Sequence, residues 1–340
     1  MIQPLKPNAE LLQLRGEAQK EFHEKAARAA RARFGKRVFV RAVVEVSNFC
    51  RENCAYCGMR RDNRSLSRFR ASHEQMAELI LHHRPSSITD INIQAGEDPV
   101  AVREVVLPLI RTLRRETDLG ISVCLGSLSH SIYAELKNAG ASIYIIKFEI
   151  GDPVRYAEMQ APGKYEERLN NIQHLASTGW RVSSGFIAGL PGQTPDDLLQ
   201  NLSLADDLPL DGCSVSPFIP GDESPLANAP MADIDVTLNC MAAMRLMRPD
   251  WVIPSVSALN LAEPGQGYRR GLRTGANLVT INMTPSDIRG NYLLYKRDRF
   301  IMTEERILEA IAAEGLEPSS QSLVDFFGRE SATEGVRSAI

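Results

Sequence analysis

The chain has 340 residues, of which 24% are charged and 44% are hydrophobic, a composition typical of a folded globular protein. Its 39 Lys and Arg residues nearly balance 42 Asp and Glu residues, and the net charge of −3 argues against a dedicated nucleic-acid-binding protein. No apolar run reaches the roughly 18 residues of a membrane span, and the first residues lack the apolar stretch of a signal peptide. We therefore expect a soluble, cytoplasmic protein that binds neither nucleic acid nor membrane.

Strand-like and helix-like segments alternate along the chain. Residues 9–35 are rich in Ala, Glu, Arg and Leu at helical spacing and predict one or two leading helices. Apolar and β-branched runs predict eight strands, at 37–47, 88–94, 120–125, 142–148, 181–188, 213–218, 251–256 and 277–282. Amphipathic runs predict helices between and after them, at 73–83, 101–117, 129–139, 165–178, 194–207, 233–247, 266–273 and 303–314.

This alternation predicts an α/β fold, and the number of strands predicts a closed (β/α)8 barrel of the TIM type. An open doubly wound sheet is the competing architecture, but no Gly-x-Gly-x-x-Gly follows the first strand. We expect an N-terminal helical extension over 1–36, the barrel over 37–317 and a C-terminal tail over 318–340. Because the sequence near the C-terminus is polar, we expect a loosely attached tail there.

The six cysteines are distributed unevenly, as Cys50, Cys54, Cys57, Cys124, Cys213 and Cys240. The first three form a C-x3-C-x2-C run directly after the first predicted strand, and an Arg-rich stretch, RRDNRSLSRFR, follows at 60–70. In a large chain without a signal peptide, such a trio indicates metal ligation rather than disulfides. Three thiolates leave one iron of a four-iron cluster open, whereas a closed zinc site needs a fourth ligand, and no Cys or His lies nearby.

The trio and its surroundings resemble a known family. CRENCAYC resembles the cluster loop of radical S-adenosylmethionine (SAM) enzymes. The longer run VEVSNFCRENCAYCGMRRDN is similar to the subgroup of the iron–iron hydrogenase maturase HydE, the methylornithine synthase PylB and biotin synthase, and most similar to the maturase. The resemblance extends over 37–317, through QAGEDP, YEERLN, GLPGQT, PFIPGDESPLAN and the GAN of 275–277. It implies a radical SAM barrel that cleaves SAM reductively at a 4Fe-4S cluster to give a 5′-deoxyadenosyl radical.

The resemblance also implies roles for individual residues. Cys50, Cys54 and Cys57 would hold the cluster, and SAM would bind its fourth iron. Arg168 would bind the SAM carboxylate, which suits the bidentate geometry of a guanidinium, although outside this family it would be interpreted as a surface helix charge. Further contacts to SAM are expected from Tyr56, Gly96, Glu97, Glu149, Ile187, Ala188 and Gly189.

The substrate is expected in the barrel interior, among inward-facing side chains near the strand ends. The polar candidates are Ser122, Lys147, Ser216, Ser255, Ser257, Thr284, Arg289 and Tyr292. The family implies a small molecule of cofactor or amino-acid biosynthesis, and a flavodoxin or ferredoxin as electron donor. The sequence does not reveal which small molecule is the substrate, because the fold does not fix the function.

Three alternatives stay open. A sulfur-inserting synthase of the biotin or lipoate type needs an auxiliary cluster, but Ser122 and Ser183 stand where its cysteines are expected, and Cys124 alone cannot hold a cluster. A methylornithine-synthase-like mutase is the second alternative, although SVSALN at 255–260 does not match its pattern cleanly. A non-catalytic iron–sulfur or zinc protein is the third. We expect Cys213 and Cys240 to be buried core residues.

Overall fold

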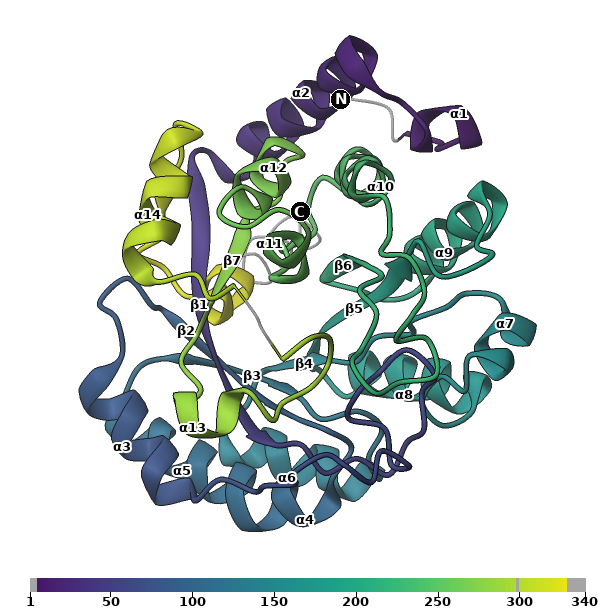
Figure 1. Cartoon of the computed structure of the whole chain (residues 1–340). Coiled ribbons are helices and arrows are strands. Elements are labelled where there is room, and N and C mark those ends of the chain that lie inside the picture. Colours follow the sequence, from purple (N-terminus) through teal and green to yellow (C-terminus); the bar gives the residue numbers. More distant parts are fainter. Residues whose placement is uncertain (1–4, 298–299, 329–340) are drawn as a thin grey trace.

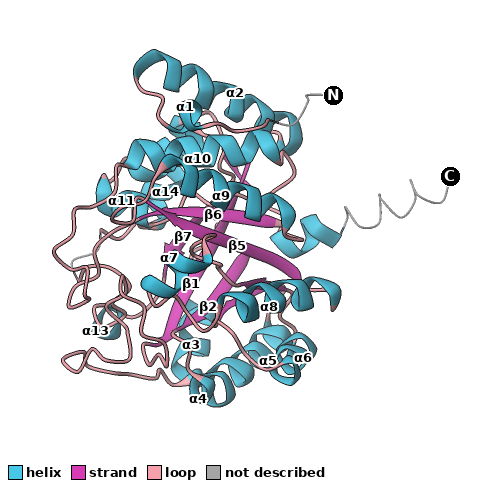
Figure 2. Cartoon of the chain, turned by 90° about the vertical axis from the view of Figure 1, so that its right-hand side faces the viewer, coloured by secondary structure: helices cyan, strands magenta, loops and turns pink. Residues whose placement is uncertain are grey.

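Parallel strands surrounded by helices make up the body of the molecule. The structure is a computed structural model that describes residues 5–297 and 300–328. The helices form a ring around the strands (Figure 1), and α1 and α2 lie outside that ring, beside α10 (Figures 1 and 2). The strands are β1 (Arg37–Ser47), β2 (Asp90–Ala95), β3 (Gly120–Cys124), β4 (Ile143–Ile145), β5 (Arg181–Ala188), β6 (Gly212–Pro217), β7 (Leu278–Asn282) and β8 (Glu317–Pro318).

The helices fall where the amphipathic runs predicted them, with several short ones added. They are α1 (Ala9–Leu12), α2 (Gly16–Phe34), α3 (His73–His83), α4 (Pro99–Ala101), α5 (Leu107–Glu116), α6 (His130–Ala139), α7 (Pro153–Glu158), α8 (Tyr165–Ser177), α9 (Pro195–Asp207), α10 (Ile234–Met247), α11 (Ala258–Ala262), α12 (Gly267–Arg273), α13 (Ser286–Arg289) and α14 (Glu304–Ala313). A π-helical turn, Val102–Val106, joins α4 to α5. Ser72, Thr194 and Thr303 begin α3, α9 and α14, because each side-chain oxygen accepts a hydrogen bond from a backbone N–H three residues on.

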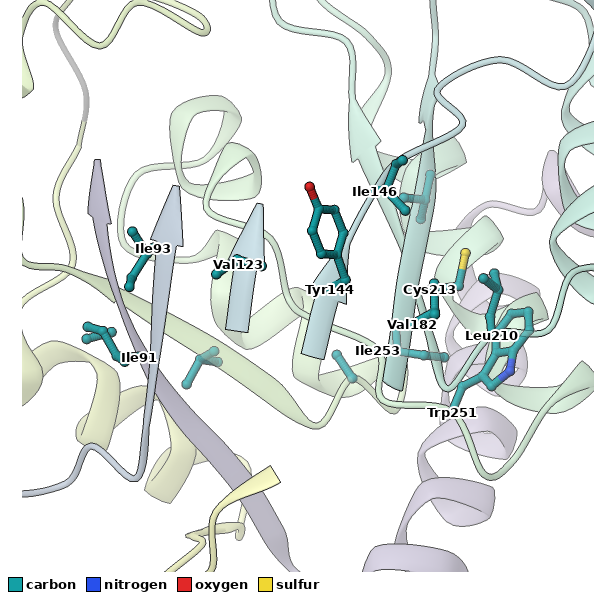
Figure 3. Close-up of a cluster of buried hydrophobic side chains, with 14 of the residues drawn as sticks. Ile91, Ile93, Val123, Tyr144, Ile146, Val182, Leu210, Cys213, Trp251 and Ile253 are labelled. Atoms are coloured by element: carbon teal, nitrogen blue, oxygen red, sulfur yellow. The ribbon is translucent and has the colours of Figure 1, made fainter. Parts of the chain in front are cut away.

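The strand order across the sheet is β6-β5-β4-β3-β2-β1-β7. Strands β1 to β6 lie side by side in chain order, and β7 pairs in parallel with the free edge of β1, opposite β2. Parallel order with a helix between consecutive strands is the arrangement of a TIM-type barrel, so the predicted fold class is confirmed. The predicted closure is not, because in the described part of the chain β6 and β7 do not pair and the sheet stays open between them. Apolar residues on the outer face of the strands form the layer beneath the helices. Figure 3 shows a part of this layer, with Ile91 and Ile93 of β2, Val123 of β3 and Val182 of β5.

The eighth predicted strand, 251–256, forms no regular strand. The segment makes two isolated bridges instead, Val252 with Gly212 of β6 and Pro254 with Leu278 of β7. The Cys213 N–H of β6 donates to the Val252 carbonyl, and the Ser255 N–H donates to the Leu278 carbonyl of β7. These two bonds hold the segment between β6 and β7. Pro254 has no N–H to donate, which limits the ladder at this position. The segment therefore connects β6 and β7 near the start of these strands only.

Residues 319–328 pack against the start of the barrel strands, so the expectation of a loosely attached tail is wrong for them. Leu323, Phe326 and Phe327 are buried in a cluster with Phe34 and Phe39. The Leu323 N–H donates to both carboxylate oxygens of Asp90, at 3.1 and 3.0 Å. Residues 329–340 of the predicted tail lie outside the described residues, and the division of the chain at 36 and 317 stays a prediction.

The N-terminal helices contact the outside of the barrel. α2 packs on α10 and α12, and it buries Phe22, Ala26 and Ala29 there. The sequence prediction of one or two leading helices is thus confirmed. Among the described residues, no helix is long and apolar enough to span a membrane.

Candidate active site

The cysteine loop follows β1 and lies across the ends of neighbouring strands. The Gly96 N–H, just after β2, donates to the Ser47 carbonyl at 2.9 Å, and the Arg51 N–H donates to the Glu97 carbonyl at 3.1 Å. A Cβ atom on Gly96 would lie 2.2 Å from the Phe49 carbonyl oxygen, so only glycine permits this close approach. The loop is thereby fixed at the carboxyl ends of the strands, where active sites of TIM-type barrels lie.

An internal cavity of about 360 Å³ extends from the cysteine loop through the barrel to the 319–328 segment, since Cys50 and Phe327 both line it. A volume of this size suits a small molecule. The cavity brings together the three loop cysteines and most of the residues predicted to contact SAM: Cys50, Cys54, Cys57, Tyr56, Gly96, Glu97, Glu149, Arg168 and Ile187. Ala188 and Gly189 do not line it. Ala188 is fully buried, and the Gly189 N–H donates to Gln193 Oε1 at 2.6 Å.

Burial dominates the electrostatics of the three loop thiols. It raises the pKa of Cys50 and Cys54, and it raises the pKa of Cys57 to about 12. Neutral thiols are therefore the stable form when no cation is present, and a bound metal would have to displace their protons. No three His, Cys, Asp or Glu side chains of the described residues converge on a point where they would bind a single metal ion. A cluster needs no such convergence, because each thiolate binds a different iron.

A buried ion pair lies next to the loop. Arg168 of α8 is only 2% exposed, and its Nη2 lies 2.6 Å from Glu97 Oε1 and 3.2 Å from the Pro162 carbonyl. Arg51 binds the other Glu97 oxygen, with its Nη2 at 3.2 Å from Oε2. Burial disfavours the charge on Arg168, but Glu97 and Tyr156 together outweigh burial and raise the pKa of Arg168. The Arg168 Nε–H is buried and has no acceptor among the described residues, so it can still bind an anionic group.

A second ion pair lies in the cavity wall beyond β4. Lys147 Nζ is 2.9 Å from Glu149 Oε2, and both side chains line the cavity. Glu149 has a positive φ of 65°, a conformation that non-glycine residues seldom adopt and that is often found at functional sites. Its N–H donates to the Gly185 carbonyl and its carbonyl accepts from Ile187, which fixes this turn to β5. Burial opposes the charge on Lys147, but Glu149 and Tyr295 together raise its pKa.

The cavity separates the predicted substrate residues into two groups. Lys147, Ser216, Ser257 and Tyr292 line it. The other four do not, and the structure gives each a partner elsewhere. The Ser122 hydroxyl donates to the Ile91 carbonyl, and that of Ser255 donates to the Tyr268 carbonyl. Thr284 Oγ1 accepts from the Glu45 N–H, and Arg289 donates to the Thr284 carbonyl.

Several polar residues of the cavity wall were not predicted. Arg41 and Glu45 of β1 line the cavity, and so does Tyr295. A signal for the first two is visible in the sequence, because two charged residues four positions apart interrupt an otherwise apolar strand and share one face of it. Tyr295 follows Tyr292 by three positions, but nothing in the sequence places that segment over the barrel.

The three single cysteines differ in their surroundings. Cys124 lines the cavity at the end of β3, and burial raises its pKa to about 11. Cys213 and Cys240 are fully buried in the apolar layer, as predicted. Figure 3 shows Cys213 among Leu210, Val182 and Trp251. Cys124 is thus the one cysteine outside the loop trio that reaches the cavity.

Comparison with known proteins agrees with this site. The family model of the radical SAM superfamily matches residues 44–205. The chain is 36% identical over 261 residues to the [FeFe] hydrogenase maturase subunit HydE of Thermotoga maritima, covering 77% of this chain and 74% of that protein. It is 27% identical over 321 residues to 3-methylornithine synthase of Methanosarcina acetivorans, covering 92% of this chain and 89% of that protein. The crystal structure of methylornithine synthase PylB has the same fold, with a TM-score of 0.81, 22% identity and 94% of each chain covered.

The chain belongs to the radical SAM superfamily, and it is a radical SAM enzyme. Members of this family use a 4Fe-4S cluster and SAM, and the donor set of the site fits both groups. Thiols from three cysteines on one loop suit iron. The buried Arg168 Nε–H, which has no acceptor among the described residues, and the two cavity carboxylates suit the charged ends of an amino acid.

Proposed function

We propose that this enzyme cleaves SAM reductively at a cluster held by Cys50, Cys54 and Cys57 and directs the resulting radical at a small molecule in the barrel cavity. One observation carries the proposal. The three thiols, the Arg168 guanidinium and the Glu149 carboxylate line the same internal cavity, although they come from three distant parts of the chain. When bound, the cluster and SAM supply a 5′-deoxyadenosyl radical, and the residues of this chain bind, orient and shield the reactants.

The SAM contacts follow from charge and position. Arg168 donates from its unpaired Nε to the SAM carboxylate, while Glu97 holds the guanidinium in place from the other side. Glu149, in the segment that follows β4, accepts from the SAM amine or ribose. Tyr56 and Ile187 give the apolar surface against which adenine packs. Gly96 keeps the backbone close to the cysteine loop, whereas Ala188, the last residue of β5, and Gly189 do not line the cavity and are not assigned a contact to SAM.

The substrate is a small molecule of cofactor or amino-acid biosynthesis, in a reaction like that of HydE. The identity of 36% to the maturase supports this class. Lys147, Ser216, Ser257 and Tyr292 bind the polar groups of the substrate from the cavity wall, with Tyr295 as an additional contact. The electron comes from a protein carrier such as a flavodoxin or ferredoxin. The cytoplasm suits such an enzyme, because its thiols are kept reduced there.

The test is the appearance of the two products of SAM cleavage. Anaerobically reconstituted enzyme with SAM and dithionite should release methionine and 5′-deoxyadenosine, which chromatography quantifies. Cys50→Ala, Cys54→Ala and Cys57→Ala should each abolish both products, because an iron loses its ligand. Cys240→Ala is the matched control and should retain measurable cleavage, since that thiol lies in the apolar layer of α10.

Two results would contradict the proposal. If the wild-type enzyme released neither product with its cluster intact, the non-catalytic iron–sulfur or zinc protein would be the better interpretation. If Cys240→Ala lost cleavage as completely as the loop variants while still folded, the loop cysteines would have no special role.

A further inference from the structure

The Arg-rich stretch that follows the cysteines divides into two groups in the structure. Arg68 and Arg70 turn inward. The Arg68 guanidinium donates to the backbone carbonyls of four loop residues, Asn48, Met59, Arg60 and Asn63, and Arg70 Nε lies 2.7 Å from Asp98 Oδ2. These two residues hold the loop together. The side chains of Arg60, Arg61 and Arg64 donate to no backbone carbonyl of the described residues, so they do not share the structural role of Arg68.

We name Arg60, Arg61 and Arg64 of this stretch, together with Arg297, the arginine rim; Arg51 is not part of it, because its guanidinium binds Glu97. The side chains of Arg61 and Arg297 are 60% and 47% exposed, and each makes an ion pair at the surface, Arg61 with Asp62 and Arg297 with Glu223. Arg64 is exposed and makes no hydrogen bond or ion pair with the described residues, and Arg60 makes no ion pair with them. The stretch 60–70 contains five arginines and one acidic residue, Asp62, whereas the whole chain has a net charge of −3.

The arginine rim is bound directly to the loop that carries the thiols. The Arg61 N–H donates to the Glu52 carbonyl at 2.7 Å, and the Arg60 N–H donates to the Cys57 carbonyl at 3.3 Å. Arg60 Nε also donates to Asn53 Oδ1 at 2.9 Å. Arg297 joins from the other side, because its Nη2 lies 3.3 Å from Glu223, which in turn accepts from Ser65. The exposed positive charge thus lies over the cysteine loop.

We propose that the arginine rim is the docking surface for an acidic electron-carrier protein that reduces the cluster. The inference rests on the proposed function, because each reductive cleavage of SAM consumes one electron. In the docked complex the carrier is oxidised by one electron and the cluster is reduced by one electron, with no bond formed and no proton moved. Exposed arginines attract an acidic partner over long range and speed its encounter, and salt weakens this attraction. Their position over the cluster loop brings the carrier close to its electron acceptor.

The test compares two reductants on one variant. Arg61→Glu combined with Arg64→Glu reverses two exposed charges that touch neither the cavity nor the thiols. With a flavodoxin reduced by its NADPH-dependent reductase, SAM cleavage by this variant should be slower by about tenfold or more at low salt, because steering contributes roughly that much. With dithionite, a small reductant that needs no docking surface, the cleavage rate should equal that of the wild type. The flavodoxin-driven rate of the wild type should fall as salt is added.

The matched control places the same charge change elsewhere. Arg111→Glu combined with Arg115→Glu alters exposed residues of α5, which contacts α3 and α6. This control should keep the wild-type rate with both reductants. The proposal is overturned if the rim variant keeps its flavodoxin-driven rate, if it loses the dithionite rate to the same degree, or if salt leaves the wild-type flavodoxin rate unchanged. Failure of dithionite-driven cleavage in the wild type would instead contradict the proposed function.

Discussion

Gly96 is the residue at which β2 meets the cysteine loop, and its lack of a side chain sets the distance between them. A Cβ atom there would lie 2.2 Å from the Phe49 carbonyl oxygen and 3.0 Å from the Cβ of Cys50. These atoms belong to the backbone and to a proposed cluster ligand, so the loop itself has to shift. We expect Gly96→Ala to lower the iron content and the SAM cleavage rate at least tenfold, while the fold persists. Iron analysis and the cleavage assay measure both effects.

Gly290→Ala is the control for this prediction. Gly290 has a φ of −63°, which any residue adopts, and a Cβ atom there would meet nothing within 4 Å. The control should keep its iron and its activity. Full iron content in Gly96→Ala would show that the loop tolerates displacement and that the close approach is not required.

At the scale of residues, the sequence predicts chemistry better than position. The spacing of Cys50, Cys54 and Cys57 places three thiols on one loop whatever the rest of the chain does, and the cavity contains all of them. The polar strand residues are different. Ser122 and Cys124 lie on the same strand face, yet only Cys124 lines the cavity, whereas Ser122 is buried with its hydroxyl hydrogen-bonded to the Ile91 carbonyl and Asn92. Competition of this kind between neighbours is decided by tertiary packing, which the sequence pattern does not contain.

Among the elements, two segments in the C-terminal part of the chain show where composition misleads a prediction. WVIPSV at 251–256 has the composition of a buried strand, but Pro254 removes a donor, and the segment makes only two bridges. The polar residues after 318 have the composition of a tail, but Leu323, Phe326 and Phe327 find a buried cluster across the start of the strands. In both places composition was a poor guide, because burial depends on which partners the fold supplies.

Asp90 links this C-terminal segment to β2 and makes the link sensitive to pH. Burial raises the pKa of its carboxyl to about 6, while the Leu323 N–H, Thr89 and Arg41 favour the charged form and Asp325 opposes it. Since the unfolded value is about 3.9, the stability contributed by the neutral carboxyl is present below pH 4 and is lost as the pH rises through 6. The total contribution to the free energy of unfolding is about 3 kcal/mol, and roughly half of it is lost above pH 5.

We therefore expect Asp90→Asn to remove part of the pH dependence of stability. Between pH 5 and 7.5 the urea midpoint of the wild type should fall more than that of Asp90→Asn, because the amide cannot ionise. Asp118→Asn, which alters an exposed residue, should retain the wild-type difference. Equal slopes in the wild type and Asp90→Asn would show that the carboxyl titrates near its ordinary value in the folded protein.

For the whole molecule, the distribution of thiols separates a single-cluster enzyme from a sulfur-inserting synthase. The loop trio and Cys124 share the cavity, whereas Cys213 and Cys240 lie in the layer between strands and helices. Ser183 lines the cavity where a further cluster ligand would be needed, and a hydroxyl is a poor ligand for iron–sulfur clusters compared with a thiolate. Because one further thiol is too few for a second cluster, we expect a single cluster per chain and a cavity that is free for the substrate.

The reconstituted enzyme should accordingly contain about four irons per chain, as one 4Fe-4S cluster requires. Cys124→Ser should leave both the iron content and the SAM cleavage rate within about twofold of the wild type, because that thiol has no cluster to bind. Cys57→Ala is the contrasting variant and should lose most of its iron. Iron and sulfide analysis with Mössbauer spectroscopy distinguishes one cluster from two. Six or more irons in the wild type, falling toward four in Cys124→Ser, would favour a sulfur-inserting enzyme, since the extra irons would then depend on the one additional thiol in the cavity.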